Sequence, residues 1–110
     1  MKFNFFRGSV KCPISICYEH YKPESNRIIV YNNSPHTIES AEITLKNSSN
    51  KSFLFKEERI EKKSCSLIDY AHRADINGVH FIGDISEVNI KSNAGNFKFA
   101  AQSEKLFTLL

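Results

Sequence analysis

The residue types best suited to chemistry gather in one short stretch of the second half of the chain. Cys65, Asp69, His72 and Asp75 bring together a thiol, two carboxylates and an imidazole. A nucleophilic site needs such a thiol beside a histidine base and an orienting acid. Catalytic groups are recognised by their geometry and not by closeness in sequence. Cys65 also lies among apolar residues, where a thiol resists ionisation. We therefore predict a protein that is not an enzyme, with a small hydrolase or metal-dependent enzyme using Cys65 and His72 as the alternative.

A second group of candidate metal ligands lies near the start of the chain. Cys12, Cys17 and His20 are metal-binding types, but structural zinc sites usually use paired C-x₂₋₄-C knuckles. On a strand, the odd separation of Cys12 and Cys17 points them to opposite faces. We predict no metal and no cofactor, with Cys12 filling the core and Cys17 on the other face. An odd number of cysteines without an export signal predicts reduced thiols.

The charge pattern argues against a nucleic-acid partner. The formal net charge is +3, and the basic pair Lys62-Lys63 follows an acidic stretch. Single-stranded nucleic acids favour aromatic platforms between basic residues, which Phe53 and Phe55 resemble. These two phenylalanines, however, alternate as core residues do. A nucleic-acid-binding domain is kept as a second alternative.

No stretch of the sequence has the length of a membrane-spanning helix. Such a helix needs about 20 apolar residues, and the sequence has no comparable run. The first residues contain neither the apolar region nor the small-residue cleavage site of a secretory signal. We predict a cytoplasmic protein without a membrane span.

Alternation of apolar and polar residues, with a period of two, predicts strands along most of the chain. The clearest alternation runs from Val10 to Tyr21, where Pro13 indicates an edge strand or a strand start. Ile38 is out of phase with its neighbours, which predicts a bulge. The best hairpin joins 85–91 to 96–101 through Ser92-Asn93-Ala94-Gly95. The strands are predicted at 10–21, 27–32, 37–46, 52–56, 64–70, 79–82, 85–91 and 96–101, with a helical turn or a last strand in the tail.

Short strands at regular spacing, with turn residues between them, are typical of a sandwich or barrel. A length of 110 residues fits one domain. We predict that residues 1–110 form a single all-β domain, an antiparallel immunoglobulin-like β-sandwich of about seven strands.

One segment resembles a known family. The stretch from Arg27 to Leu45, RIIVYNNSPHTIESAEITL, has a strand that ends in Asn, a polar turn, a Thr-Ile pair and an alternating strand. This order resembles bacterial immunoglobulin-like accessory domains of the FxLYD type, although the Leu-Tyr-Asp signature is absent. Residues 60–64 occupy the place of that family's Pro-Gly-rich step. The resemblance implies a sandwich fold.

Apolar termini and one irregular connection are the predicted binding regions. Exposed aromatic clusters mark interaction surfaces, and unpaired sheet edges accept an added strand. We predict a non-enzymatic protein-binding module or homo-oligomer, a subunit or inhibitor of a bacterial or phage assembly. It would bind through a sheet edge, the loop from Ala71 to Gly78, or its termini. The candidate residues are Phe3, Phe5, Phe6, His72, Arg73, Leu106, Phe107, Leu109 and Leu110.

Overall fold

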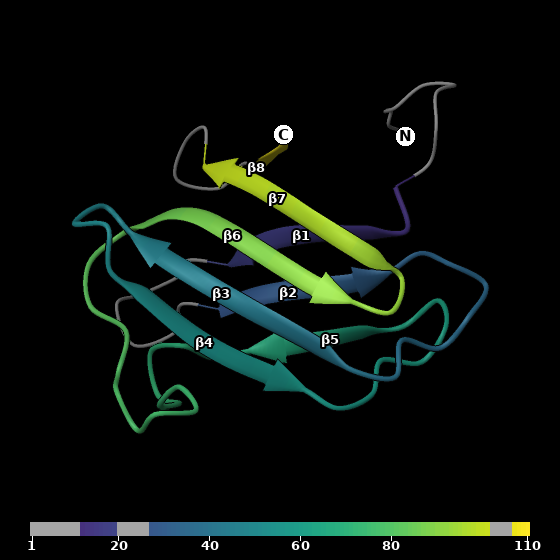
Figure 1. The fold of residues 1–110 in the computed structure, drawn as a ribbon, viewed down its shortest axis with the longest axis horizontal. Coiled ribbons are helices and arrows are strands. Elements are labelled where there is room, and N and C mark those ends of the chain that lie inside the picture. Colours follow the sequence, from purple (N-terminus) through teal and green to yellow (C-terminus); the bar gives the residue numbers. More distant parts are fainter. Residues whose placement is uncertain (1–11, 20–26, 102–106) are drawn as a thin grey trace.

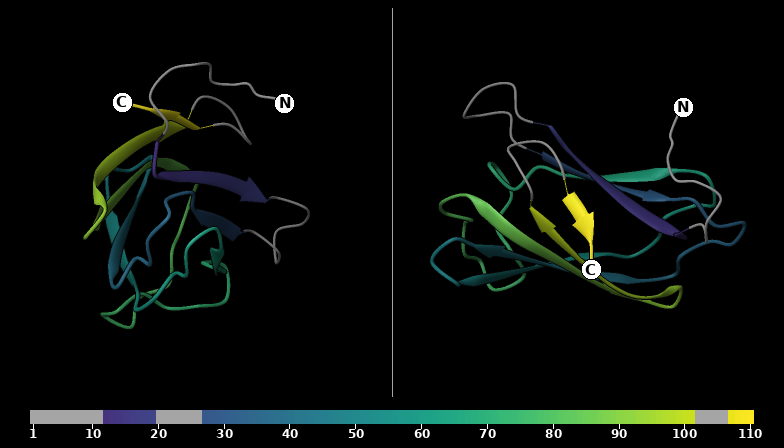
Figure 2. Two further views of the ribbon diagram at one scale, coloured as in Figure 1. Left: turned by 90° about the vertical axis from the view of Figure 1, so that its right-hand side faces the viewer. Right: turned by 90° about the horizontal axis from the view of Figure 1, so that it is seen from above.

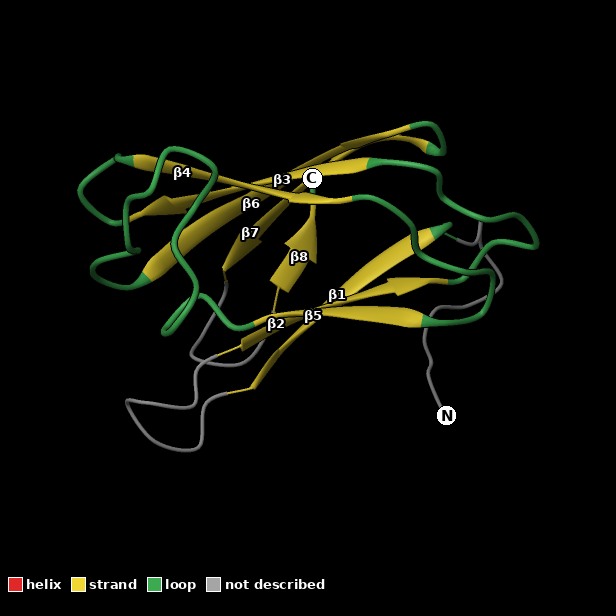
Figure 3. Ribbon diagram, turned by 90° about the horizontal axis from the view of Figure 1, so that it is seen from below, coloured by secondary structure: helices red, strands yellow, loops and turns green. Residues whose placement is uncertain are grey.

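The described part of the chain is built entirely from strands, turns and loops. The structure, a computed structural model, describes residues 12–19, 27–101 and 107–110. Two antiparallel sheets lie face to face (Figure 1; Figure 3) and confirm the predicted all-β sandwich. The finer immunoglobulin-like assignment stays a prediction. The eight strands are β1 (Ile14–Glu19), β2 (Arg27–Asn32), β3 (Ala41–Asn47), β4 (Ser52–Glu57), β5 (Cys65–Ile68), β6 (Ile85–Ser92), β7 (Gly95–Ala101) and β8 (Phe107–Leu109).

The smaller sheet has the order β1-β2-β5. Its edge strand β1 begins directly after Pro13, as predicted, because proline has no N–H to donate. The central strand β2 reads Arg27-Ile-Ile-Val-Tyr-Asn32, and its apolar centre is buried. Both pairings are antiparallel, and Ile28 and Val30 turn toward the other sheet.

The larger sheet has the order β4-β3-β6-β7-β8. The predicted hairpin between β6 and β7 is confirmed, and Ser92 pairs with Gly95 across a two-residue loop. Gly95 has a φ of +125°, and a Cβ there would lie 3.1 Å from Cζ of Phe97. The inward residues of both sheets form one core cluster, as the alternation predicts. Its members are Ile14, Ile28, Val30, Ile38, Ala41, Ile43, Leu45, Phe53, Phe55, Ile60, Ile68, Tyr70, Val88, Ile90 and Phe99.

Two connections cross between the sheets and pair with each other. Ile38 lies between β2 and β3, and Ile60 lies between β4 and β5. Each donates its backbone N–H to the other's carbonyl at 2.9 Å, and both side chains are buried. The predicted bulge at Ile38 is therefore wrong. Ile38 is out of phase because it belongs to a crossover that packs on the core, and β3 begins later, at Ala41.

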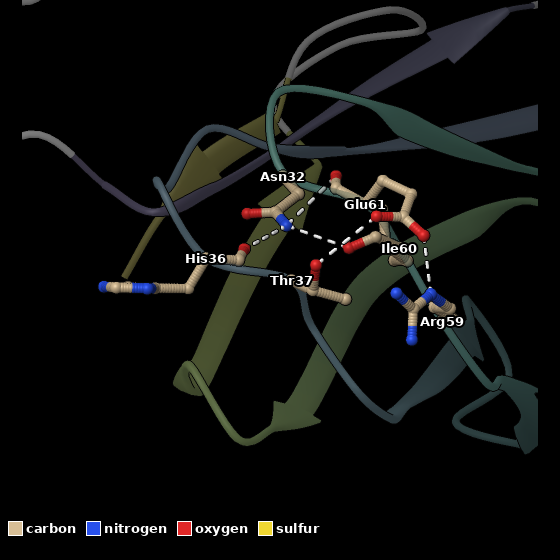
Figure 4. A network of polar contacts seen from close by, with 6 residues as sticks. All are labelled: Asn32, His36, Thr37, Arg59, Ile60 and Glu61. Carbon is tan, nitrogen blue, oxygen red and sulfur yellow. Dashed lines mark hydrogen bonds and ion pairs between the residues drawn. The ribbon is translucent and has the colours of Figure 1, made fainter.

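Asn32 holds these crossovers together from a buried position (Figure 4). Its Nδ2 donates to the carbonyls of His36, Ile60 and Glu61 at 2.8, 3.0 and 3.2 Å. Its Oδ1 accepts from the Ser34 backbone N–H and hydroxyl. One side chain thus supplies hydrogen-bond partners to backbone groups of the crossovers that lie outside the strand ladders. Buried polar groups generally require such partners.

An exposed ion pair lies at the rim of the same network. Arg59 Nε donates to Glu61 Oε2 at 2.5 Å, and the Thr37 hydroxyl donates to Glu61 Oε1. The hydrogen bond and charge of Arg59 lower the pKa of the Glu61 carboxyl, and Glu61 raises the pKa of Arg59 in turn. Because both side chains are solvated, we assign this pair little stabilising effect.

Two other predicted segments differ from the structure, and the tail takes one of its two predicted forms, a last strand. The strand predicted at 64–70 is shorter, Cys65–Ile68, and Cys65 is exposed where apolar surroundings were predicted. Residues 79–82 form no strand, because only Phe81 packs on the core while Val79 and Ile82 face solvent. The tail forms β8, which pairs with β7 and lies near β1 (Figure 2).

We expect Asn32→Asp to destabilise the fold by about 2–3 kcal/mol, because a carboxylate oxygen would replace the amide donor that faces three carbonyls. Chemical denaturation measures this change in the free energy of unfolding. Asn96 is exposed, so Asn96→Asp makes the same substitution without a buried partner and serves as the control. Equal effects of the two variants would show that Asn32 does not hold the crossovers.

Candidate functional site: an anchored loop beside an open strand edge

Residues 69–84 connect β5 of the small sheet to β6 of the large sheet and form a long irregular loop (lower left in Figure 1). Loops of this length without secondary structure are uncommon in compact domains and usually functional when ordered. The loop runs along the side of the sandwich where β4 and β5 are the edge strands (Figure 3).

Asp75 anchors the first half of the loop. Its Oδ1 accepts the backbone N–H groups of Asn77 and Val79, both at 2.9 Å, and its Oδ2 accepts that of Leu54 at 3.2 Å. The Asp75 residue is 7% exposed. The backbone hydrogen bond from Val79, followed by those from Asn77 and Leu54, lowers the pKa of the Asp75 carboxyl against the opposing effect of desolvation. The Asp75 carboxylate is thus ionised and acts as a structural clamp, because it joins the backbone of the loop to that of β4.

The same loop closes the free edge of β4. The Ile76 N–H donates to the Leu54 carbonyl at 2.9 Å, while Asp75 accepts the Leu54 N–H. Farther along, Nη2 of Arg73 donates to the Lys56 carbonyl at 3.0 Å. These are groups that β4 turns away from β3. At Leu54 and Lys56 the edge covered in this way no longer offers a full template for another chain.

Arg73 is fixed by more than this one bond. Its Nη1 donates to Glu57 Oε2 at 2.6 Å, and its guanidinium lies 5.5 Å from the centroid of the buried Phe55 ring. The other carboxylate oxygen of Glu57 accepts a short hydrogen bond from the Ser66 hydroxyl of β5. Glu57 therefore links β4, β5 and the loop through one carboxylate.

The second half of the loop is anchored by an aromatic side chain and an asparagine. The Phe81 ring packs against Phe53 and Tyr70 with centroids 4.9 and 5.0 Å apart. Asn47, which is buried, donates from Nδ2 to the Ile82 carbonyl at 2.8 Å. The Ser48 N–H donates to the Asp84 carbonyl. Both halves of the loop are thus attached to the large sheet.

Between these anchors the loop exposes large aliphatic side chains. Ile76, Val79 and Ile82 are 57%, 47% and 65% exposed. Single exposed apolar residues are ordinary, but three within one attached loop need an explanation. Their backbones contribute to holding the loop while their side chains contribute little to the core. The loop therefore presents an apolar surface on a fixed frame.

On the same side of the sandwich, the edge of β5 is open. Asn32 N–H donates to the Ser64 carbonyl, and bonded pairs alternate in antiparallel ladders. Val30–Ser66 and Ile28–Ile68 are therefore the next bonded pairs. Cys65 and Leu67 turn their N–H and C=O groups away from β2, and within the described residues no hydrogen bond reaches them.

The residues of the proposed catalytic alternative have separate roles in the structure. Cys65 lies at the start of β5 and Asp69 follows its end. The strand from Cys65 to Ile68, about 10 Å long, therefore lies between the thiol and this carboxylate. His72 Nδ1 pairs with Asp69 at 3.0 Å in an exposed position. Asp75 is occupied by backbone donors. Phe53 and Phe55 are buried, as their alternation predicts, and so provide no stacking platform for a nucleic acid.

The apolar tail divides between the core and the surface. Phe107 packs against the core cluster, and the Leu110 N–H donates to the Lys98 carbonyl. Leu109 and Leu110 remain largely exposed. Of the other predicted binding residues, His72 is exposed and Arg73 is mainly structural. Phe3, Phe5, Phe6 and Leu106 lie outside the described residues.

Sequence reasoning missed Ile76, Val79 and Ile82 as surface residues. The run Val79-His-Phe-Ile82 has the composition of a strand, and only Phe81 follows that expectation by packing inward. A signal was present in Asp75-Ile-Asn-Gly78, where Asp, Asn and Gly are the residue types that turn a chain back on itself.

A polar hollow of about 330 Å³ lies where β3 begins and β6 ends. Glu39, Glu42 and Lys91 are among its lining residues, and Asn93 is occupied by a hydrogen bond from the Glu39 N–H. Within 12–19, 27–101 and 107–110, no three His, Cys, Asp or Glu residues are grouped closely enough to hold a metal ion. The hollow is open and offers no set of converging ligands.

In comparisons with known proteins, no family model, curated protein or solved structure matches this chain. The resemblance to FxLYD-type domains thus stays a prediction. The described residues include no helix that is long and apolar enough to cross a membrane.

We expect Asp75→Asn to lower the midpoint of thermal unfolding at neutral pH, because an amide NH₂ would face one of the backbone donors. The folded-state pKa of Asp75 is lowered, so its stabilising effect is complete above the unfolded pKa of about 3.9 and is lost as the pH falls through the folded value. The variant should therefore lose less stability below about pH 4 than the natural protein. Thermal scans from neutral to acid pH test this.

Asp84 is exposed, so Asp84→Asn provides the control for a general loss of one carboxylate. A thermal midpoint and acid sensitivity that are the same in both variants would contradict the role of Asp75 as a clamp.

Proposed function

We propose that this protein is a non-enzymatic protein-binding module that binds its partner through the loop of residues 69–84. The observation that carries the proposal is the exposure of Ile76, Val79 and Ile82 on a loop attached at both halves. Complete burial of an exposed aliphatic side chain contributes about 1.5–3 kcal/mol, and each of these three, being roughly half exposed, would contribute about half of that against a partner. Three of them are enough to form the apolar centre of a small interface.

Attachment of the loop supports this function through pre-organisation. A loop that must order on binding loses conformational entropy, which reduces affinity. Here the Asp75 hydrogen bonds, the Phe81 ring contacts and the Asn47 hydrogen bond already hold the backbone. A partner would meet a prepared surface, in the way that binding loops on rigid scaffolds generally act.

The charged residues of the loop suit the rim of such an interface. His72 pairs with Asp69 in solvent, and Arg73 is neutralised by Glu57. Interfaces commonly place an apolar centre inside a polar rim. The same pairs offer no converged nucleophile and base, so the protein-binding proposal is favoured over the hydrolase alternative.

Site-specific photo-crosslinking in cells of the source organism tests the proposal. We expect a photoreactive phenylalanine at position 79 to form defined protein adducts, because the Val79 side chain faces the partner. The same residue placed at Lys98, which is exposed on β7, should form none of these adducts. Mass spectrometry of the adducts identifies the partner.

The combined variant Ile76→Ser, Val79→Ser and Ile82→Ser gives the matching loss of function. Purified partner should bind it at least tenfold more weakly, a loss of about 1.4 kcal/mol or more, while its thermal midpoint stays close to that of the natural protein. Adducts that form equally from positions 79 and 98, or unchanged affinity of the serine variant, would refute the proposal.

A further inference from the structure

Asn77 and Gly78 form an Asn-Gly dipeptide in the loop of residues 69–84, and the sequence contains no other. In any chain, the backbone nitrogen that follows an asparagine can attack the side-chain amide carbon, and the next side chain normally obstructs this approach. Gly78 has no side chain, and a Cβ placed there would meet no atom within 4 Å. The Asn77 residue is exposed. Asn77 thus has the neighbour and the open surroundings that favour this reaction.

A tight turn around Asp75 holds these two residues in the folded loop. The Gly78 N–H donates to the Asp75 carbonyl at 2.9 Å, and the Asp75 N–H donates to the Val79 carbonyl at 2.8 Å. The Asp75 carboxylate accepts the N–H groups of Asn77 and Val79. The ring contacts that attach the loop to the core belong to Phe81, outside this turn. The turn can therefore open locally while the core stays packed, as exposed loops do at little cost in free energy.

Opening of the turn permits a chemical sequence whose only added reactant is water. The Gly78 nitrogen bonds to Cγ of Asn77 and gives up its proton, the Cγ–Nδ2 bond breaks, and the amide nitrogen takes up the proton and leaves as ammonia. Water then hydrolyses the cyclic succinimide at one of its two carbonyls. One product is aspartate, and the other is isoaspartate, in which the main chain passes through Cγ. Because the attacking nitrogen must be deprotonated, the rate rises with pH.

Both products put a negative charge beside the Asp75 carboxylate. In the natural protein the Asn77 side-chain amide is among the groups that lower the pKa of Asp75, so it favours the ionised carboxylate. A carboxylate at position 77 would instead repel it, because nearby like charges oppose each other. Isoaspartate also lengthens the main chain between Asp75 and Val79 by one carbon, which displaces the N–H groups that Asp75 accepts. Either product therefore weakens the clamp.

We propose that Asn77 is a site of spontaneous deamidation, and that its conversion to aspartate or isoaspartate releases the turn of residues 75–79 from the Asp75 carboxylate. The reaction needs no enzyme and no partner, so it goes beyond the proposed function and is tested without it. Where the loop binds a partner, conversion would remove part of the pre-organisation and weaken binding as the molecule ages.

Ageing of the purified protein, followed by peptide mapping with mass spectrometry, tests the chemistry. Asn50 and Asn93 are also exposed, but each precedes a residue with a side chain, so they serve as internal controls. We expect Asn77 to convert several-fold faster than either, faster at mildly alkaline than at neutral pH, and faster still in denaturant, where the turn is absent. Asn77→Gln should stay intact, because glutamine would have to form a larger ring. An Asn77 amide that persists in the folded protein while it converts in denaturant would overturn the proposal, as would conversion of Asn50 or Asn93 at the same rate.

Hydrogen exchange tests the consequence for the loop. Asn77→Asp reproduces one product, and Asn96→Asp makes the same change at an exposed position outside the loop. We expect the Val79 N–H to exchange several-fold faster in Asn77→Asp than in the natural protein, and at its natural rate in Asn96→Asp. The N–H of Val88, in the core strand β6, should keep its protection in both variants, which excludes misfolding as the cause. Unchanged exchange at Val79 in Asn77→Asp would overturn the release of the turn.

Discussion

The whole fold depends on satisfying the backbone polar groups of connections that leave the sheets. Three buried polar side chains, Asn32, Asn47 and Asp75, meet this need. Each accepts or donates several hydrogen bonds to backbone outside the regular strand ladders. An unpaired buried donor or acceptor costs about 1–3 kcal/mol, a large part of the 5–15 kcal/mol that stabilises a typical domain. Without these side chains the core residues would still alternate, but the crossovers and the long loop would lack a defined course.

The same constraint gives the two edges on one side of the sandwich different properties. At β4, the loop of residues 69–84 supplies hydrogen-bond partners to Leu54 and Lys56. At β5, no hydrogen bond from the described residues reaches the outward groups of Cys65 and Leu67. Natural sheets usually protect their edges because open ones associate.

Alternation in the sequence predicted the strands that build the core, because a period of two directly reports burial on one face. Ala41, Ile43, Leu45, Val88, Ile90 and Phe99 alternate with more polar residues and all lie inside, while Phe97 is only partly buried against the core. Alternation gave the wrong local structure at three places. Ile38 belongs to a crossover, Cys65 lies on the outer face of the small sheet, and most of residues 79–82 form the surface of a loop. The course of the long loop was beyond sequence reasoning, because Asp75 reaches Leu54 and Asn47 reaches Ile82 across the fold. Asp75 lies in the stretch that holds the candidate catalytic residues, but its carboxylate accepts hydrogen bonds from backbone N–H groups.

The proposed binding surface lies on a loop and not on a sheet face, and this placement has a physical advantage in a small protein. Sheet residues exposed for binding are taken from strands that must also supply the core, so a change there alters stability as well. Ile76, Val79 and Ile82 lie beyond the core cluster, whereas Phe81 and Asp75 carry the attachment. Under the proposed function, binding and folding would thus use different side chains of the same segment.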